Sequence, residues 1–188
     1  MPTLRRPAGR SALLVLLLAL VLPQAPLGAQ GQIAQQPAAQ PPIRTAVQAL
    51  VTYVADGDTI YVQLPQEPGR QRPVRLQGID APEICQEGGP QARAALQDRV
   101  LGQTVDLQTA GQDDYGRDLA RVYWHGQDLG RLLVQQGLAW SYRIGPQAAP
   151  YAAEQRQARE QGRGLFAQAG PEPPWRFRRR HGSCRANP

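Results

Sequence analysis

Hydrophobic and polar residues alternate in short runs along the middle of the chain, which is the pattern of half-buried β-strands. Runs of this kind cover residues Val47–Val54, Thr59–Leu64, Pro73–Gln77, Thr104–Ala110 and Leu119–Trp124. The first two runs flank Asp56-Gly57, a dipeptide that suits a tight hairpin turn because it accepts positive φ angles. The pattern therefore predicts five strands, of which the first two form a hairpin.

Three segments carry helix signals. The first predicted helix covers residues 90–101, which begin with proline and are followed by Gly102. A second helix would be capped by Asp128 and ended by Gly137. A third covers residues 150–162. The order β-β-β-α-β-β-α-α predicts an α+β, mainly β fold: a five-stranded Greek-key barrel of the OB type with three helices. Such barrels often bind nucleic acid through strand faces and loops. A different α+β sheet remains open on pattern alone.

The N-terminal region differs from this body. Residues 1–29 combine three arginines, an apolar run over 12–22 and small residues before position 30, which is the pattern of a secretory signal peptide. An uncleaved membrane anchor is the alternative. We therefore expect an exported protein, periplasmic or secreted, without stable membrane association after the signal is removed. Residues 30–45, rich in Gln, Ala and Pro, read as a flexible linker.

We expect a compact domain over residues 46–170, followed by a basic tail over residues 171–188. We expect the protein to be a monomer. All 21 basic residues are arginine. Removing the three in the signal leaves 18 arginines against 15 acidic residues, so the excess is mild and is weak support for a polyanionic partner. Five of the arginines crowd the tail, while the body is close to balanced.

Two cysteines, Cys85 and Cys184, are present. In an exported protein two cysteines favour a disulfide over a metal or catalytic pair, and two unrelated thiols are the alternative. The tail alternates Trp175 and Phe177 with arginines, so it could dock on the barrel as an arm or remain a solvated basic tail. A bridge would pin its arginines beside the loop that follows Glu83.

Several polar residues lie where strands begin and end. Asp58 stands at the start of the second strand, and Asp80 and Ala81 follow the third. Pro82 restricts Ala81 to an extended conformation, which fixes its carbonyl relative to the Asp80 carboxylate. Two carboxylates and a carbonyl are hard oxygen ligands that suit Ca²⁺, with water completing the shell, and do not suit Zn²⁺.

Two arginines and one carboxylate accompany this oxygen cluster. Arg75 lies within the third strand, Arg117 at the start of the fifth, and Glu83 just after the oxygen cluster. Each arginine alone would be read as a surface charge or as half of an ion pair. Together with a cation they supply what phosphodiester hydrolysis needs: positive charge on the phosphoryl oxygens and a carboxylate for the attacking water.

The stretches "VADGDTIYV", "VRLQGIDAPE" and "DDYGRDLARVYW", followed by "LVQQGLAW" and "GRGLF", resemble the staphylococcal nuclease family over about residues 47–166. The resemblance implies an OB-fold, Ca²⁺-dependent nuclease that cuts DNA and RNA and leaves 3′-phosphates. It implies metal ligands Asp58, Asp80 and Ala81, a water-positioning or activating Glu83, phosphate-binding Arg75 and Arg117, and a substrate contact at Tyr115.

The sequence also departs from the family. Asp114 stands where the founding member has a lysine, so a phosphate contact is lost. The aromatic residues of the base pocket are ambiguous, with Tyr142 or Trp140 as the candidate that stacks on a base and Arg143 as a backbone contact. The alternative function is an OB-fold module that binds single-stranded nucleic acid without cleaving it. Because the five charged residues of the family motif are all present, we favour catalysis.

Overall fold

The computed structural model describes residues 46–143 and 149–184, all of which belong to the unit Gln40–Pro188. The predicted signal peptide over 1–29 and the predicted linker over 30–45 lie outside the described residues. Among the described residues, no helix is both long enough and apolar enough to span a membrane.

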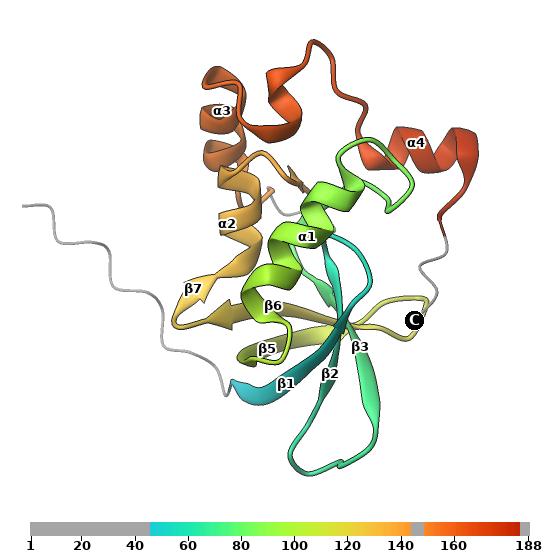
Figure 1. The fold of residues 1–188 in the computed structure, drawn as a ribbon, viewed down its shortest axis with the longest axis vertical. Coiled ribbons are helices and arrows are strands. Elements are labelled where there is room, and N and C mark those ends of the chain that lie inside the picture. The colour runs from blue at the N-terminus through green and yellow to red at the C-terminus, as the bar shows by residue number, and fades with distance from the viewer. Residues whose placement is uncertain (1–45, 144–148, 185–188) are drawn as a thin grey trace, which may run out of the picture. The chain divides into compact units, whose positions relative to one another are not determined.

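A closed five-stranded barrel forms the centre of this unit (Figure 1). Its strands are β1 Val47–Val54, β2 Thr59–Gln63, β3 Gln71–Leu76, β5 Thr104–Gln112 and β6 Asp118–Trp124. They are hydrogen-bonded in the order β3-β2-β1-β5-β6, and a parallel pairing of β3 with β6 closes the barrel. The predicted barrel of the OB type is therefore confirmed.

Three short strands that the sequence pattern did not predict complete the β-structure. They are β4 Ile79–Asp80, which pairs with β8 Trp140–Ser141, and β7 Gln127–Asp128, which pairs with β6. A two-residue strand contains too few positions to show alternation. The β4–β8 pair matters for function because it fixes Asp80 opposite Trp140.

Four α-helices are present among the described residues, one more than predicted. The expected ones are α1 Gly89–Val100, α2 Leu129–Gln135 and α3 Ala152–Glu160, and Asp128 caps α2 by accepting a hydrogen bond from the Arg131 N–H. A 3₁₀ turn, η1, covers Gly164–Ala167. The additional helix, α4 Pro174–His181, lies in the basic tail.

The tail docks on the body, the first of the two alternatives considered from the sequence, and the docked part is a helix. Pro174 starts α4 and is buried, Phe177 is partly buried, and Gly182 follows the last turn. The side chains of Phe177 and His181, one helical turn apart, stack with ring centroids 4.7 Å apart. The apolar residues of this eight-residue stretch, Pro174, Trp175 and Phe177, all lie in its first half, which is too short a run to show a helical period in the sequence.

The hairpin between β1 and β2 is built differently from the sequence-based expectation. The turn spans four residues, and Gly57 is not among the glycines with positive φ. What requires glycine here is space: a Cβ atom on Gly57 would lie 2.6 Å from the Ala92 Cβ and 2.8 Å from the Ala81 Cβ. The turn is therefore pressed between helix α1 and the chain that follows β4.

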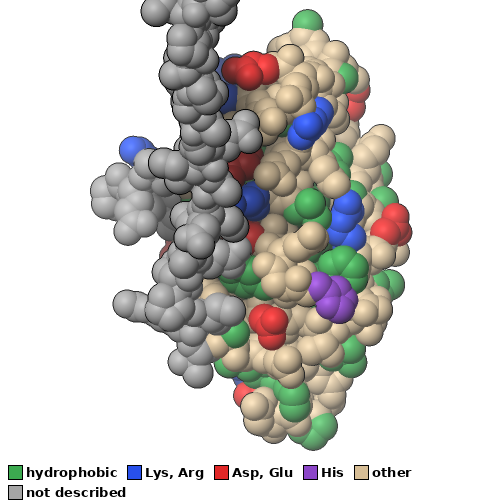
Figure 2. Space-filling model, turned by 90° about the vertical axis from the view of Figure 1, so that its left-hand side faces the viewer, with side chains coloured by type: hydrophobic (Ala, Val, Ile, Leu, Met, Phe, Trp, Pro, Cys, Tyr) green, Lys and Arg blue, Asp and Glu red, His purple; other side chains and the backbone are tan. Residues whose placement is uncertain are grey.

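Two buried clusters hold the unit together. The larger contains the inward residues of the barrel, among them Val51, Ile60 and Val74, together with Leu96 of α1 and Leu133 of α2. The smaller is made of Trp140, Ala158 and Phe166 beside α3 and η1. On the face seen in Figure 2, acidic and basic side chains are scattered, in keeping with the balanced charge of the body.

Candidate active site

Asp58 and Asp80, the two predicted carboxylate ligands, are both buried and lie close together. Asp58 directly precedes β2, and Asp80 ends β4 with only 1% of its surface exposed. The Ala81 N–H donates a hydrogen bond of 2.7 Å to Oδ2 of Asp58. The short β4 strand thus places Asp80 and Ala81 beside the carboxylate of Asp58, which lies 22 positions before Asp80 in the chain.

Arg75 of β3 joins the two carboxylates. Its Nη2 atom lies 2.9 Å from Oδ2 of Asp58 and 3.2 Å from Oδ1 of Asp80. Arg75 is therefore part of an ion pair, which is one of the roles considered for it from the sequence. Its role in phosphate binding remains a prediction. Since one nitrogen atom contacts both acids, one small cation could also be shared between them.

The donor set fits a hard divalent cation. The structure gathers two carboxylates, and an Ala81 backbone carbonyl stands next to them in the chain, while no group of three or more His, Cys, Asp or Glu side chains among the described residues could hold a metal ion by itself. A cation here would therefore need backbone and water oxygens as well, a set of donors that suits Ca²⁺.

Burial makes two carboxyl groups of this region, those of Asp56 and Asp80, costly to ionise. Desolvation by burial, followed by the charge of Asp58 nearby, raises the pKa of Asp56 to about 8. Burial also raises the pKa of Asp80, against the opposing effect of its arginine partners. Asp56 is connected to the site through its Oδ1 atom, which accepts a hydrogen bond of 2.9 Å from the Asp58 N–H.

Arg117, which directly precedes β6, is linked to the cluster through Thr59. The Thr59 hydroxyl donates to Oδ1 of Asp58 at 3.1 Å and accepts from Nη1 of Arg117 at 3.3 Å. Asp113 holds Arg117 from the other side, with 2.7 Å between Nε and Oδ2. Burial alone would raise the pKa of Asp113, but the hydrogen bonds from Arg117 lower it.

The predicted substrate contacts differ in exposure. Tyr115 is 84% exposed at the turn before β6, with the Arg117 guanidinium 5.4 Å from its ring centroid. Tyr142 is also exposed, and its N–H donates to the Gly78 carbonyl. Trp140 is buried in the smaller cluster, edge-on to Phe166, so the interpretation of Trp140 as a base-stacking residue is wrong. Arg143 is exposed.

Glu83 follows the oxygen cluster and is held by the C-terminal segment. Its Oε1 accepts a hydrogen bond of 3.1 Å from Nη1 of Arg178, and its Oε2 accepts one of 3.1 Å from the Cys184 N–H. Arg178 lies on α4 and also contacts Asp80. Burial would lower the pKa of Arg178, but these carboxylate partners raise it.

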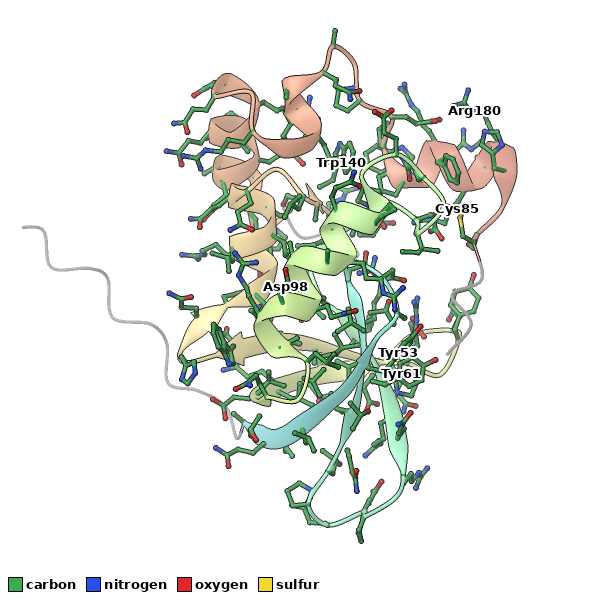
Figure 3. All side chains as sticks on the ribbon, in the orientation of Figure 1. Tyr53, Tyr61, Cys85, Asp98, Trp140 and Arg180 are labelled. Carbon is green, nitrogen blue, oxygen red and sulfur yellow. A yellow bond between two sulfur atoms is a disulfide. The ribbon has the colours of Figure 1, made fainter. Side chains whose placement is uncertain are left out.

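A disulfide joins Cys85 and Cys184, the pairing that the cysteine count favoured, with 6.0 Å between the two Cα atoms. Figure 3 shows the yellow bond at Cys85, where the loop before α1 meets the chain that follows α4. Cys85 stands two residues after Glu83. The bridge therefore fastens the tail to the loop that carries Glu83.

Four residues of the site were missed by sequence reasoning: Asp56, Thr59, Asp113 and Arg178. The first three stand inside the motif stretches, and their polar character within a turn or at a strand start was the available signal. Arg178 is 98 positions from Asp80. Only the predicted disulfide hinted that the tail approaches this loop.

The closed OB-type barrel thus carries a buried carboxylate pair in contact with Arg75, while Thr59 links Arg117 to the pair and Glu83 lies beside Asp80. Residues 73–168 match the family model described as "Staphylococcal nuclease homologue". The chain belongs to this family.

Curated relatives agree with this assignment. An "Uncharacterized endonuclease" of Escherichia coli O157:H7 is 37% identical over 131 residues, covering 69% of this chain and 84% of its own length. An "Uncharacterized endonuclease" of Haemophilus influenzae is 36% identical over 129 residues, covering 69% and 71%. A "Micrococcal nuclease" of Shigella flexneri is 36% identical over 140 residues, covering 69% and 79%.

Proposed function

We propose that this protein is an exported, Ca²⁺-dependent phosphodiesterase that hydrolyses DNA and RNA and leaves 3′-phosphates. The observation that carries the proposal is the convergence of Asp58 and Asp80 on a single nitrogen of Arg75, at 2.9 and 3.2 Å. Two buried carboxylates that share one cationic group could share a divalent cation in the same way. The phosphate group of the substrate would then bind to that cation and to the arginine. The family membership supports the same chemistry.

Asp58, Asp80 and the carbonyl of Ala81 would hold the cation. When bound, Ca²⁺ supplies positive charge that stabilises the phosphoryl oxygens as negative charge develops on them. The burial of Asp80 and its fixed place on β4 keep these ligands in position without a large rearrangement. Oxygen donors fixed in advance lower the reorganisation that accompanies charge development.

The two arginines would act on the phosphate from two sides. Arg75 reaches the carboxylate pair from β3, and Arg117 reaches the same pair from β6 through the Thr59 hydroxyl. Planar guanidinium groups donate paired hydrogen bonds to phosphate oxygens. Asp113 orients Arg117 by accepting from its Nε atom, and Thr59 accepts from Nη1. Nη2 would then be the nitrogen that donates to the substrate.

Glu83 would orient the attacking water or accept its proton. The carboxylate stands beside Asp80, since both accept hydrogen bonds from Nη1 of Arg178. A carboxylate within hydrogen-bonding reach of the water would take its proton as the water oxygen bonds to phosphorus. The bond to the 5′ oxygen would break, that oxygen would take a proton from solvent, and the phosphate would remain on the 3′ side. Exposed Tyr115 and Tyr142 would contact the flanking sugar or base.

The test is cleavage of single-stranded DNA, double-stranded DNA and RNA by the chain from Gln30 onward, first with Ca²⁺ and then with EGTA. We expect cleavage that stops on chelation, and product ends that a 3′-phosphatase converts to hydroxyls. An Asp80→Asn variant is the matched control, because it removes one proposed ligand while keeping the side-chain shape. Binding to single strands without any cleavage would instead identify a non-catalytic OB-fold module.

Export is tested separately. The full chain is expressed in a bacterium, and the N-terminus of the protein outside the cytoplasm is determined by mass spectrometry. We expect the mature protein to begin at Gln30, to be free of the membrane fraction and to elute as a monomer. A chain that keeps residues 1–29 and sediments with membranes would support the anchor interpretation.

A further inference from the structure

Arg178, on helix α4, contacts two carboxylates of the acidic cluster. Its Nη1 donates to Oδ1 of Asp80 at 3.0 Å and its Nη2 donates to Oδ2 of the same residue at 3.0 Å. Nη1 also reaches Oε1 of Glu83 at 3.1 Å. The guanidinium therefore forms a bidentate pair with one acid and a further bond with the other, the strongest geometry available to arginine.

This contact uses the oxygen atoms that the proposed cation would need. Oδ1 of Asp80 accepts from both Arg75 and Arg178, and Oδ2 accepts from Arg178. A hard divalent cation binds carboxylate oxygen directly, so it cannot approach either oxygen of Asp80 freely while both nitrogens of Arg178 remain there. Arg178 and a divalent cation are alternatives at this carboxylate.

Three connections keep α4 at this position. Nε2 of the buried Gln86 donates to the Glu172 carbonyl at 2.7 Å, just before the helix. After the helix, the Cys184 N–H donates to Glu83, and Cys184 is bonded to Cys85. A group tethered on both sides acts at a high effective concentration, in the millimolar range for short flexible links.

We propose that Arg178 is a tethered internal cation that competes with Ca²⁺ for Asp80 while it also holds Glu83, and that the Cys85–Cys184 disulfide keeps it in place. This inference rests on the proposed function. The other arginines of α4 make no such contact: Arg180 pairs with Glu172, and Arg176 and Arg179 are exposed. The helix thus directs one guanidinium into the site and leaves others at the surface.

The disulfide gives this competition a redox dependence. A dithiol reductant can reach the bond because Cys85 is exposed. In thiol–disulfide exchange the reductant is oxidised to its own disulfide, the Cys85–Cys184 bond breaks, and each protein sulfur gains a proton. The segment after α4 is then released, so Arg178 leaves Asp80 more often and the cation site opens.

Calorimetric titration of Ca²⁺ into the full chain tests the inference without relying on cleavage. The Arg178→Gln variant should bind Ca²⁺ about tenfold more tightly than the wild type, since a site blocked for about nine-tenths of the time shows a tenfold weaker apparent affinity. Arg179→Gln removes the same charge from the same helix at an exposed position, and it should change the affinity by less than twofold. Circular dichroism verifies that each variant is folded.

Arg178→Lys provides a second variant that keeps the charge and the tail. Lysine cannot reproduce the bidentate contact, so its Ca²⁺ affinity should lie between those of wild type and Arg178→Gln. The Cys85→Ser/Cys184→Ser protein should also bind more tightly than wild type, and adding Arg178→Gln to it should give less than the sum of the two effects. Full additivity would show that the disulfide does not act through Arg178.

The outcomes separate this inference from the proposed function. Equal Ca²⁺ affinities in wild type and Arg178→Gln, with binding abolished by Asp80→Asn, would overturn the competition while leaving a Ca²⁺ site in place. Weaker binding in Arg178→Gln would also overturn it. Absence of Ca²⁺ binding and of cleavage in every variant would overturn both proposals.

Discussion

Gly57 lies so close to Ala92 that a Cβ atom on the glycine would stand 2.6 Å from the Cβ of the alanine. The turn that carries Asp58 is thereby pressed against helix α1. The contact shows why glycine occupies the position even though its φ angle is not positive. It also couples the packing of α1 to the placement of a proposed metal ligand.

Gly57→Ala should therefore destabilise the protein by about 1–3 kcal/mol, the usual cost of overpacking a filled site. Urea unfolding measures this change. Ala92→Gly removes the nearest clashing atom at a cost of about 1 kcal/mol in the helix, so the double variant should lose less than the sum of the single variants. Simple additivity would mean that the two positions do not clash.

Arg117→Ala should lower kcat by roughly 10³-fold, because a donor that stabilises developing charge on the phosphate is removed. Steady-state cleavage of a DNA oligonucleotide measures the change. Arg70→Ala is the control, since the Arg70 side chain is 71% exposed and pairs with Glu67, away from the site; its kcat should remain that of the wild type. A fall of less than tenfold in Arg117→Ala would contradict the proposed role.

Thr59→Val should lower kcat/KM by about 10- to 100-fold, the usual cost of losing a group that orients catalytic residues. Valine keeps the shape of threonine but lacks the hydroxyl that joins Asp58 to Arg117. Thr59→Ser, which retains the hydroxyl, should recover most of the activity. If serine and valine are equally impaired, packing of the methyl group and not the hydrogen-bonded bridge is what matters.

The barrel could be predicted because its strands alternate strictly enough to show the period of two. The predicted range Val47–Val54 coincides with β1, and the others lie within a few residues of their strands. Helix α4 could not be predicted because its stability comes from docking: Pro174 is buried, and Arg178 pairs with acids of the distant Asp80–Glu83 loop.

The site could be predicted in part, where its residues lie in recognisable local patterns. Asp58 stands in one recognisable stretch, and Arg75 and Asp80 stand together in a second. The barrel brings the three together as the motif order suggested. The polar partners that connect them were not separable from ordinary turn residues by sequence, because Thr59 and Asp113 are common at strand starts and turns. The role of Arg178 depends on a contact across 98 positions, and no local pattern encodes such a contact.

The pH dependence of stability tests the electrostatics of the acidic cluster. Burial, and then the nearby charge of Asp58, raises the pKa of Asp56 from 3.8 to about 8 in the folded protein. Below pH 3.8 Asp56 is protonated in both states, so its contribution to stability is fully present. Between the two pKa values the folded state binds the proton more tightly, so stability is lost as the pH rises and the loss is complete above pH 8.

Asp56→Asn removes this dependence, because the amide stays neutral and its oxygen can still accept from the Asp58 N–H. In EGTA, the wild type should lose more of its free energy of unfolding between pH 5 and pH 9 than Asp56→Asn does, as measured by urea unfolding. Asp98→Asn makes the same chemical change at an exposed position of α1 and should follow the wild type. Identical pH profiles for wild type and Asp56→Asn would show that Asp56 ionises normally in the folded protein.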